Sequence, residues 1–135
     1  FFFTRCATIC PMLTSNMRKV QDVLAAESGI RLLSHSVTPV ADSVSVLSAY
    51  GEANGVDSDR WWLLTGEKKE VYRLARKSYF AALDEGDGGI QDFIHTENMV
   101  MVDREGRLRG YYDGTSTEQV NKLIVDLEIL RSEYE

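Results

Sequence analysis

The sequence has 135 residues, a length that supports one domain with its own hydrophobic core over residues 1–135. Its 15 basic residues are outnumbered by 21 acidic residues, and the net charge of −6 argues against nucleic acid as a partner. No stretch reaches the roughly 18 consecutive apolar residues of a membrane-spanning helix. Because the chain opens inside a predicted strand, we expect an N-terminal portion, with any signal peptide or anchor, to be missing from this numbering.

Apolar periodicity and turn residues predict a succession of strands and helices. In chain order they are a strand at 1–5, a helix that opens after Cys6 and ends by Gly29, a strand at 30–36, a helix from about 43 to 55, a strand at 61–64, a helix at 67–78, a loop at 84–91, a hairpin of strands 99–103 and 108–112, and a last helix from about 116. We expect Asp42 or Ser43 to cap the second helix and Ser116 or Thr117 to cap the last. Gly106 is available for a left-handed position in the hairpin turn.

This order of elements, βαβαβαββα, predicts an α/β fold of the thioredoxin-like kind with one additional strand–helix unit. Right-handed crossovers place the first strand near the middle of a mixed sheet flanked by helices, with the hairpin beside it. The carboxyl ends of the parallel strands and the entry to strand 99–103 then share one edge, where open α/β sheets bind ligands. We therefore expect Cys6, Cys10 and His95 to converge at this edge.

The two cysteines of the chain, Cys6 and Cys10, form a C-x-x-x-C-P motif where an apolar run meets the start of a helix. Thiolates are the soft metal ligands and the redox nucleophiles of proteins. Cys10 is expected in the first helical turn, where the helix N-terminus favours its thiolate, while Cys6 stays on the loop. The motif alone allows a metal site, a reversible disulfide, or both.

Four segments together carry a family resemblance. They are Phe2-Phe3-Thr4-Arg5-Cys6-x-x-x-Cys10-Pro11, then Ser36-Val37-Thr38-Pro39 with Asp42, then Trp62-Leu63-Leu64-Thr65-Gly66, and finally His95-Thr96 ahead of Met99-Val-Met-Val-Asp103-x-x-Gly106. Over nearly the whole chain this pattern resembles the Sco/SenC family of copper-binding, thioredoxin-like assembly factors for cytochrome c oxidase. The C-x-x-x-C-P motif combined with a histidine about 85 residues later is the specific part of the pattern.

The resemblance implies that Cys6, Cys10 and His95 are the copper ligands. It also implies an extracytoplasmic location, in the periplasm or the mitochondrial intermembrane space, with a tether to the inner membrane. The work it implies is copper delivery, or thiol reduction, at the binuclear copper site of the oxidase. Two positions depart from many relatives: Ala7 replaces a proline, and Ile94 stands where an acidic residue directly precedes the histidine.

The chemistry of the three side chains also favours copper. Two thiolates and a neutral imidazole form a soft set that suits Cu(I), and with a weak further ligand it suits Cu(II). A structural zinc site normally has four protein ligands, and His35 is the one other conventional soft ligand in the sequence. An exposed site with three ligands is also suited to passing an ion between proteins.

Three alternatives remain open at the level of the sequence. A thioredoxin-type oxidoreductase normally has a two-residue spacer between its cysteines and a cis-proline opposite them, whereas the prolines here are Pro11 and Pro39. A peroxidase with Cys6 as the peroxidatic thiol fits the fold class. A structural disulfide in a secreted domain leaves His95 without a role.

Other candidate residues have simpler interpretations. We interpret His35 as a polar strand end rather than a ligand. Asp92 and Glu97 flank His95, and one of them is a candidate for orienting its imidazole, although plain solvation fits equally. The methionines near the cysteines and the histidine are interpreted as core residues rather than as a thioether path for copper: Met12, Met17, Met99 and Met101.

The sequence thus predicts a copper chaperone rather than an enzyme. One copper ion, Cu(I) or Cu(II), is bound through Cys6, Cys10 and His95 and is passed by ligand exchange to the copper-site subunit of cytochrome c oxidase or to another copper protein. The alternative function is a thiol-disulfide reductase acting on the cysteines of that copper site, with Cys6 as the attacking thiol. The disulfide state of the pair is expected to control loading.

Overall fold

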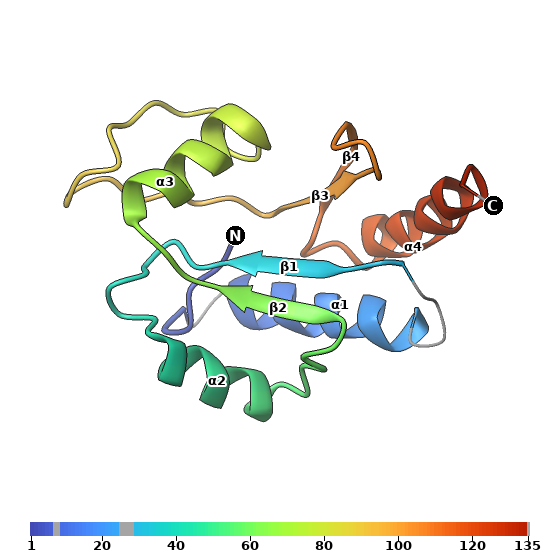
Figure 1. The fold of residues 1–135 in the computed structure, drawn as a ribbon, viewed down its shortest axis with the longest axis horizontal. Helices are drawn as coiled ribbons and strands as arrows, with labels where there is room; N and C mark the ends of the chain where they lie inside the picture. Colours follow the sequence, from blue (N-terminus) through green and yellow to red (C-terminus); the bar gives the residue numbers. More distant parts are fainter. Residues whose placement is uncertain (7–8, 25–28, 135) are drawn as a thin grey trace.

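The computed structural model describes residues 1–6, 9–24 and 29–134, which fold into helices packed around short strands (Figure 1). The elements are, in chain order, α1 (Ile9–Val23), β1 (Leu32–His35), α2 (Val44–Ala53), β2 (Trp61–Leu64), α3 (Lys68–Arg73), the π-helix η1 (Leu74–Ser78), β3 (Asn98–Val102), β4 (Leu108–Asp113) and α4 (Thr117–Ser132). The predicted order of elements is confirmed after residue 5, and the helix predicted at 67–78 changes to π-helical pairing in its second half.

The expected caps and turns set the bounds of these elements. The Ser43 hydroxyl accepts a hydrogen bond from the Val46 amide at 3.3 Å at the start of α2, and the Ser116 hydroxyl accepts one from the Gln119 amide at 3.2 Å at the start of α4. Gly106, in the turn between β3 and β4, has a φ of 81°, a conformation that glycine adopts without a steric penalty. Local sequence therefore determines where these elements begin and turn.

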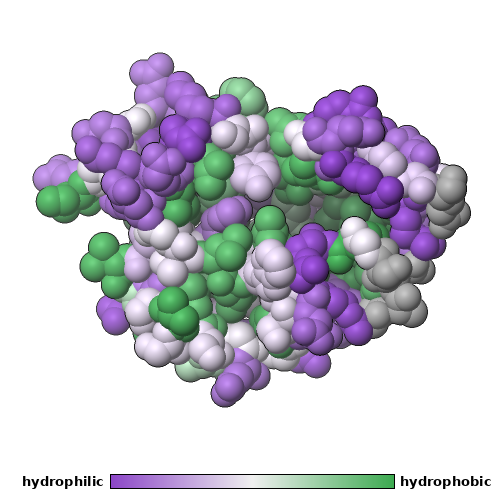
Figure 2. All heavy atoms as spheres, viewed as in Figure 1, coloured by the Kyte–Doolittle hydropathy of each residue, from purple (hydrophilic) through white to green (hydrophobic). Residues whose placement is uncertain are grey.

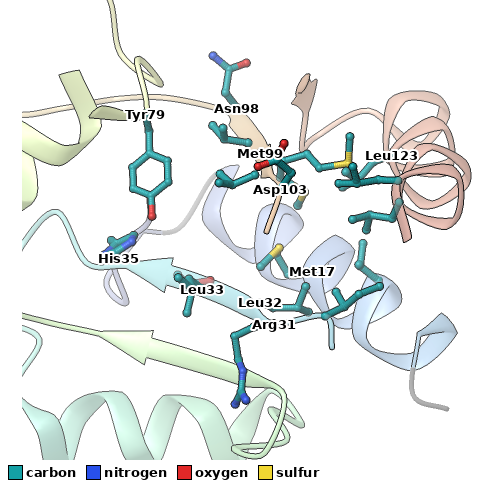
Figure 3. A pocket seen from close by; sticks show the side chains of 18 of the residues that line it. Met17, Arg31, Leu32, Leu33, His35, Tyr79, Asn98, Met99, Asp103 and Leu123 are labelled. Atoms are coloured by element: carbon teal, nitrogen blue, oxygen red, sulfur yellow. The ribbon is translucent and has the colours of Figure 1, made fainter. Parts of the chain in front are cut away.

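The strands form two separate pairs among the described residues, instead of one mixed sheet. β1 runs parallel to β2, and β3 runs antiparallel to β4. The strand predicted at 1–5 is reduced to a single parallel bridge between Phe2 and Ser36, in which the Phe2 amide donates to the His35 carbonyl and the Val37 amide donates to the Phe2 carbonyl. Residues of β1 and β3 both line a pocket of about 460 Å³ (Figure 3).

Apolar burial holds the helices against these strands. α1 and α4 pack together and α4 covers β4, while α2 packs against β2 on the other side of the molecule (Figure 1). The largest buried cluster joins α1, α4 and the hairpin: Leu13, Val20, Leu24, Met99, Met101, Tyr112, Val120, Leu123 and Leu130. Met99 and Met101 are thus core residues as predicted, and Met17 is partly buried against the same cluster. Met12 is 51% exposed and is not a core residue.

Two smaller clusters position the segments that carry the predicted ligands. One joins α3 and η1 to the chain ahead of β3: Val37, Val71, Tyr72, Ala75, Ala82 and Ile94. The other joins Phe2, Cys10 and Leu47 at the start of α1. Figure 2 shows hydrophilic side chains gathered over α3 and the loop after it, and again over the hairpin, with apolar residues between them. None of the described helices combines the length and apolar character that crossing a membrane requires.

Candidate metal centre

The two cysteines meet at the start of α1. Cys6 lies on the loop before the helix, and Cys10 is the second residue of α1. The backbone N–H of Cys10 donates a hydrogen bond to the Sγ of Cys6, with 3.4 Å between the nitrogen and the sulfur. No disulfide joins the two sulfurs. The C-x-x-x-C spacing therefore brings two soft sulfur ligands together, one on a loop and one on a helix.

The pKa of the Cys10 thiol is higher than its position at the start of a helix suggests. Its side chain is 3% exposed and packs against Phe2 and Leu47. Burial raises the pKa of the Cys10 thiol to about 11, and the hydrogen bond with Cys6 acts in the same direction. Cys10 lies in the first turn of α1 as expected, but burial outweighs the preference of a helix N-terminus for a thiolate, and the net effect is a raised pKa.

A buried carboxylate anchors the loop that carries Cys6. Asp42 is 0% exposed and accepts hydrogen bonds from the Thr4 hydroxyl at 2.5 Å, the Ser36 hydroxyl at 2.7 Å and the Thr38 hydroxyl at 3.0 Å. It also accepts one from the Thr4 amide at 3.3 Å. Of the two residues expected to cap α2, Ser43 does so. Asp42 instead ties Thr4, two residues before Cys6, to the chain that follows β1, and the nearby hydroxyls of Ser36 and Thr38 were the available sequence signal.

His95 lies on the segment that leads into β3, and aromatic rings connect this segment to the cysteine loop. The rings of Phe3 and Phe93 meet edge to face with centroids 5.2 Å apart, and the Phe93 and His95 rings are 4.5 Å apart. Phe3 packs on the same cluster as Cys6, whereas His95 is exposed. Within the described ranges no three Cys, His, Asp or Glu side chains are grouped closely enough to hold a metal ion. The structure therefore brings together Cys6 and Cys10, with His95 outside the group.

Asp92 does not orient the His95 imidazole. Its carboxylate is paired with Arg76 and accepts a hydrogen bond from the Gly88 amide at 2.8 Å. The Arg76 guanidinium lowers the pKa of Asp92 to about 2. Glu97 is exposed. Sequence reasoning missed Arg76, although a cation next to Ala75 on the inward face of a predicted helix was a usable signal.

His35 fits its interpretation as a strand-end residue. It is the last residue of β1 and stacks on Phe1 with ring centroids 5.0 Å apart, while the Tyr79 ring lies 5.8 Å away. Burial lowers the pKa of His35 to about 4, so the imidazole is neutral at pH 7. Figure 3 shows it at the margin of the pocket between β1 and β3.

The difference between the two thiols makes a prediction for alkylation. At pH 7 we expect iodoacetamide to modify Cys6 at least about tenfold faster than Cys10, because the thiolate is the nucleophile and Cys10 is both buried and held protonated. Peptide mass mapping after short exposures measures the two rates. Equal rates in the native protein would contradict the burial of Cys10, and equal rates in denaturant provide the control.

The order of elements, with a cysteine pair at the point where the chain enters its first helix, defines an α/β protein of the thioredoxin-like class. The SCO1/SenC family model matches residues 1–128, and the chain belongs to this family. The SCO1 protein homolog of Bacillus subtilis (strain 168) is 32% identical over 130 residues, which span 95% of this chain and 67% of that protein.

Solved structures of the family share the fold. The crystal structure of a SCO1/SenC family lipoprotein from Bacillus anthracis superposes with a TM-score of 0.82 at 28% identity, covering 97% of this chain and 78% of that one. BsSco superposes with a TM-score of 0.76 at 32% identity, covering 94% and 75%. BsSco is described as having a disulfide switch and as a member of the Sco family of cytochrome c oxidase assembly proteins.

Proposed function

We propose that this chain is a copper chaperone that binds one copper ion through Cys6, Cys10 and His95 and delivers it to the copper site of cytochrome c oxidase. The observation that carries the proposal is the cysteine pair itself, with the Cys10 amide 3.4 Å from the sulfur of Cys6. Two adjacent sulfurs are the donors that Cu(I) prefers, and an imidazole completes a set that also suits Cu(II).

The exposure of His95 supports a role in exchange. Its imidazole lies on the surface and rests against Phe93, whereas Cys10 lies within the core. A ligand at the surface can be replaced by a ligand of the recipient while the buried sulfur still holds the ion. Loading requires both thiols to lose their protons, because the thiolate is the ligand. No small substrate is turned over in this function.

The partner and the location are part of the same proposal. We place the protein outside the cytoplasm, tethered to the inner membrane, with the copper-site subunit of the oxidase or another copper protein as recipient. The similarity to a protein described as a lipoprotein supports a membrane tether, and the similarity to BsSco, from a family described by its role in oxidase assembly, supports the recipient.

Copper titration tests the ligand set. The reduced protein is expected to bind one equivalent of Cu(I) in competition with a chromophoric chelator. His95→Ala is expected to bind at least about 10–100-fold more weakly, because losing a ligand costs no less than losing an outer partner of a ligand. His35→Gln is the matched control and is expected to bind like the wild type. If wild type and His95→Ala bind equally weakly while the wild type reduces a test disulfide, the chaperone function is contradicted.

The second candidate is a thiol-disulfide reductase, which the proximity of the two cysteines favours. The Cys6 thiolate attacks a disulfide of the partner, forming a mixed disulfide and releasing one partner thiolate. Cys10 then attacks the mixed disulfide through its own sulfur, which releases the second partner thiolate and leaves a Cys6–Cys10 disulfide. Two electrons pass from the cysteine pair to the partner. The titration above distinguishes this function from copper delivery.

A further inference from the structure

A buried ion pair fixes the segment that carries His95. Arg76, on η1, makes two hydrogen bonds to the Asp92 carboxylate, with Nη1 2.5 Å from Oδ2 and Nη2 2.8 Å from Oδ1. The Arg76 side chain is 6% exposed and that of Asp92 is 8% exposed. The exposed Asp84 adds a third contact at 3.0 Å from Nη2. This two-point contact specifies geometry as well as charge, because the guanidinium fork matches the carboxylate.

A second cation, Lys68, forms a hydrogen bond with the backbone of Asp92. The Lys68 ammonium, on the first turn of α3, donates to the carbonyl of Asp92 at 2.6 Å and to the carbonyl of Gly89 at 2.7 Å. Lys68 and Arg76 also lie over the ring of the buried Tyr72, at 5.0 and 5.6 Å. Side chains of α3 and η1 therefore form hydrogen bonds with both the carboxylate and the backbone carbonyl of Asp92.

The other side of His95 is fixed independently. The Thr96 hydroxyl donates to the Ala81 carbonyl at 2.7 Å, and Ile94 is buried among the residues of η1 and α3. His95 thus lies between two anchored neighbours, Ile94 and Thr96, with its imidazole at the surface.

From this arrangement we infer that Arg76, Asp92 and Lys68 form a latch, a positioning device that fixes the segment of His95 where its neighbour Phe93 meets Phe3 of the cysteine loop. The inference rests on the proposed function, because it assigns to the latch the placement of the third copper ligand. The three residues touch no metal and act through His95. A buried ion pair is weak evidence for stability in itself, and its better attested role is to select one geometry among several.

The test compares Asp92→Asn with a matched control elsewhere in the fold. Asp103 is also a buried carboxylate held by arginines, with Arg107 Nε at 2.7 Å and Arg109 Nη1 at 3.2 Å, but it lies at the end of the hairpin. Asp92→Asn is expected to weaken Cu(I) binding about 10–100-fold, like the loss of an outer partner of a metal ligand. Asp103→Asn is expected to change it less than about threefold, because it is a distant, independent site.

A double-mutant cycle and a measurement without copper separate positioning from general damage. In the His95→Ala background, Asp92→Asn is expected to cause no further loss of affinity, since the latch acts through the imidazole. In the copper-free protein, amide hydrogen exchange at residues 93–96 is expected to rise at least about tenfold in Asp92→Asn and to stay unchanged in Asp103→Asn. Arg76→Lys keeps the charge without the two-point contact and serves as the milder variant if Asp92→Asn fails to fold.

The possible results distinguish a failure of the latch from a failure of the proposed copper-binding function. An equal loss of affinity in the wild-type and His95→Ala backgrounds, or unchanged exchange at residues 93–96, overturns the latch while the copper function stands. If His95→Ala binds copper as tightly as the wild type, His95 is not a copper ligand, and both the proposed ligand set and the role of the latch are contradicted. A loss that disappears without His95, together with faster exchange at 93–96, establishes the latch.

Discussion

Replacing Cys10 with serine is expected to lower Cu(I) affinity by more than about 100-fold, beyond the range known for outer partners of metal ligands, because it removes a thiolate ligand itself. A hydroxyl does not ionise at neutral pH and is a hard oxygen donor that Cu(I) does not favour. The same competition titration measures the loss. Cys6→Ser is expected to lose a comparable amount, since both sulfurs belong to the proposed set.

Because Cys10 is buried, the stability of the Cys10→Ser variant must be measured separately from its copper affinity. Serine is close to cysteine in volume, but a hydroxyl among Phe2 and Leu47 costs about 1–3 kcal/mol if it finds no hydrogen-bond partner. Denaturant unfolding of the reduced apo protein measures this cost separately from copper binding. A folded Cys10→Ser protein that still binds one Cu(I) with wild-type affinity would remove Cys10 from the ligand set.

Local elements were predictable because their signals lie within a few residues. The hydroxyl of Ser43 is three residues from the amide that it caps, and Gly106 sits in a turn between two apolar strands. Trp61 lies in a short apolar run that pairs with β1 in parallel, the arrangement that a helical crossover connection such as α2 allows. Nothing outside these segments is needed to place them.

Long-range arrangement was less predictable. In the part of the chain that the structure describes, the strands form two separate pairs, and the first predicted strand is reduced to a bridge between Phe2 and Ser36; no local pattern specifies either feature. The high pKa of Cys10 follows from its burial, which the spacing of the cysteines cannot reveal. The partner of Asp92 is 16 residues away on a helix, so sequence adjacency to His95 indicated the wrong partner. The adjacency of Cys6 and Cys10 was therefore predictable from their spacing, whereas the residues that support the cysteine loop and the position of His95 outside the pair were not.

The buried carboxylate of Asp42 is expected to be the most sensitive polar group of the fold. Asp42→Ala leaves three buried or half-buried hydroxyl donors without their shared acceptor: those of Thr4, Ser36 and Thr38. Each unsatisfied buried group costs about 1–3 kcal/mol, so we expect a loss of roughly 3–5 kcal/mol in the free energy of unfolding after partial relaxation. That is a large part of the about 5–15 kcal/mol that stabilises a typical domain.

Urea unfolding of the reduced protein, followed by tryptophan fluorescence, measures this loss. Asp59→Ala is the control, because Asp59 is exposed and is expected to change the unfolding free energy by less than about 0.5 kcal/mol. Asp42→Asn retains one carbonyl oxygen as an acceptor, so its loss of unfolding free energy should lie between those of Asp42→Ala and Asp59→Ala. Because Asp42 holds Thr4, iodoacetamide should also discriminate less between Cys6 and Cys10 in Asp42→Ala. A loss below about 1 kcal/mol would show that water replaces the carboxylate, and that the cysteine loop is held by the aromatic contact of Phe3 instead.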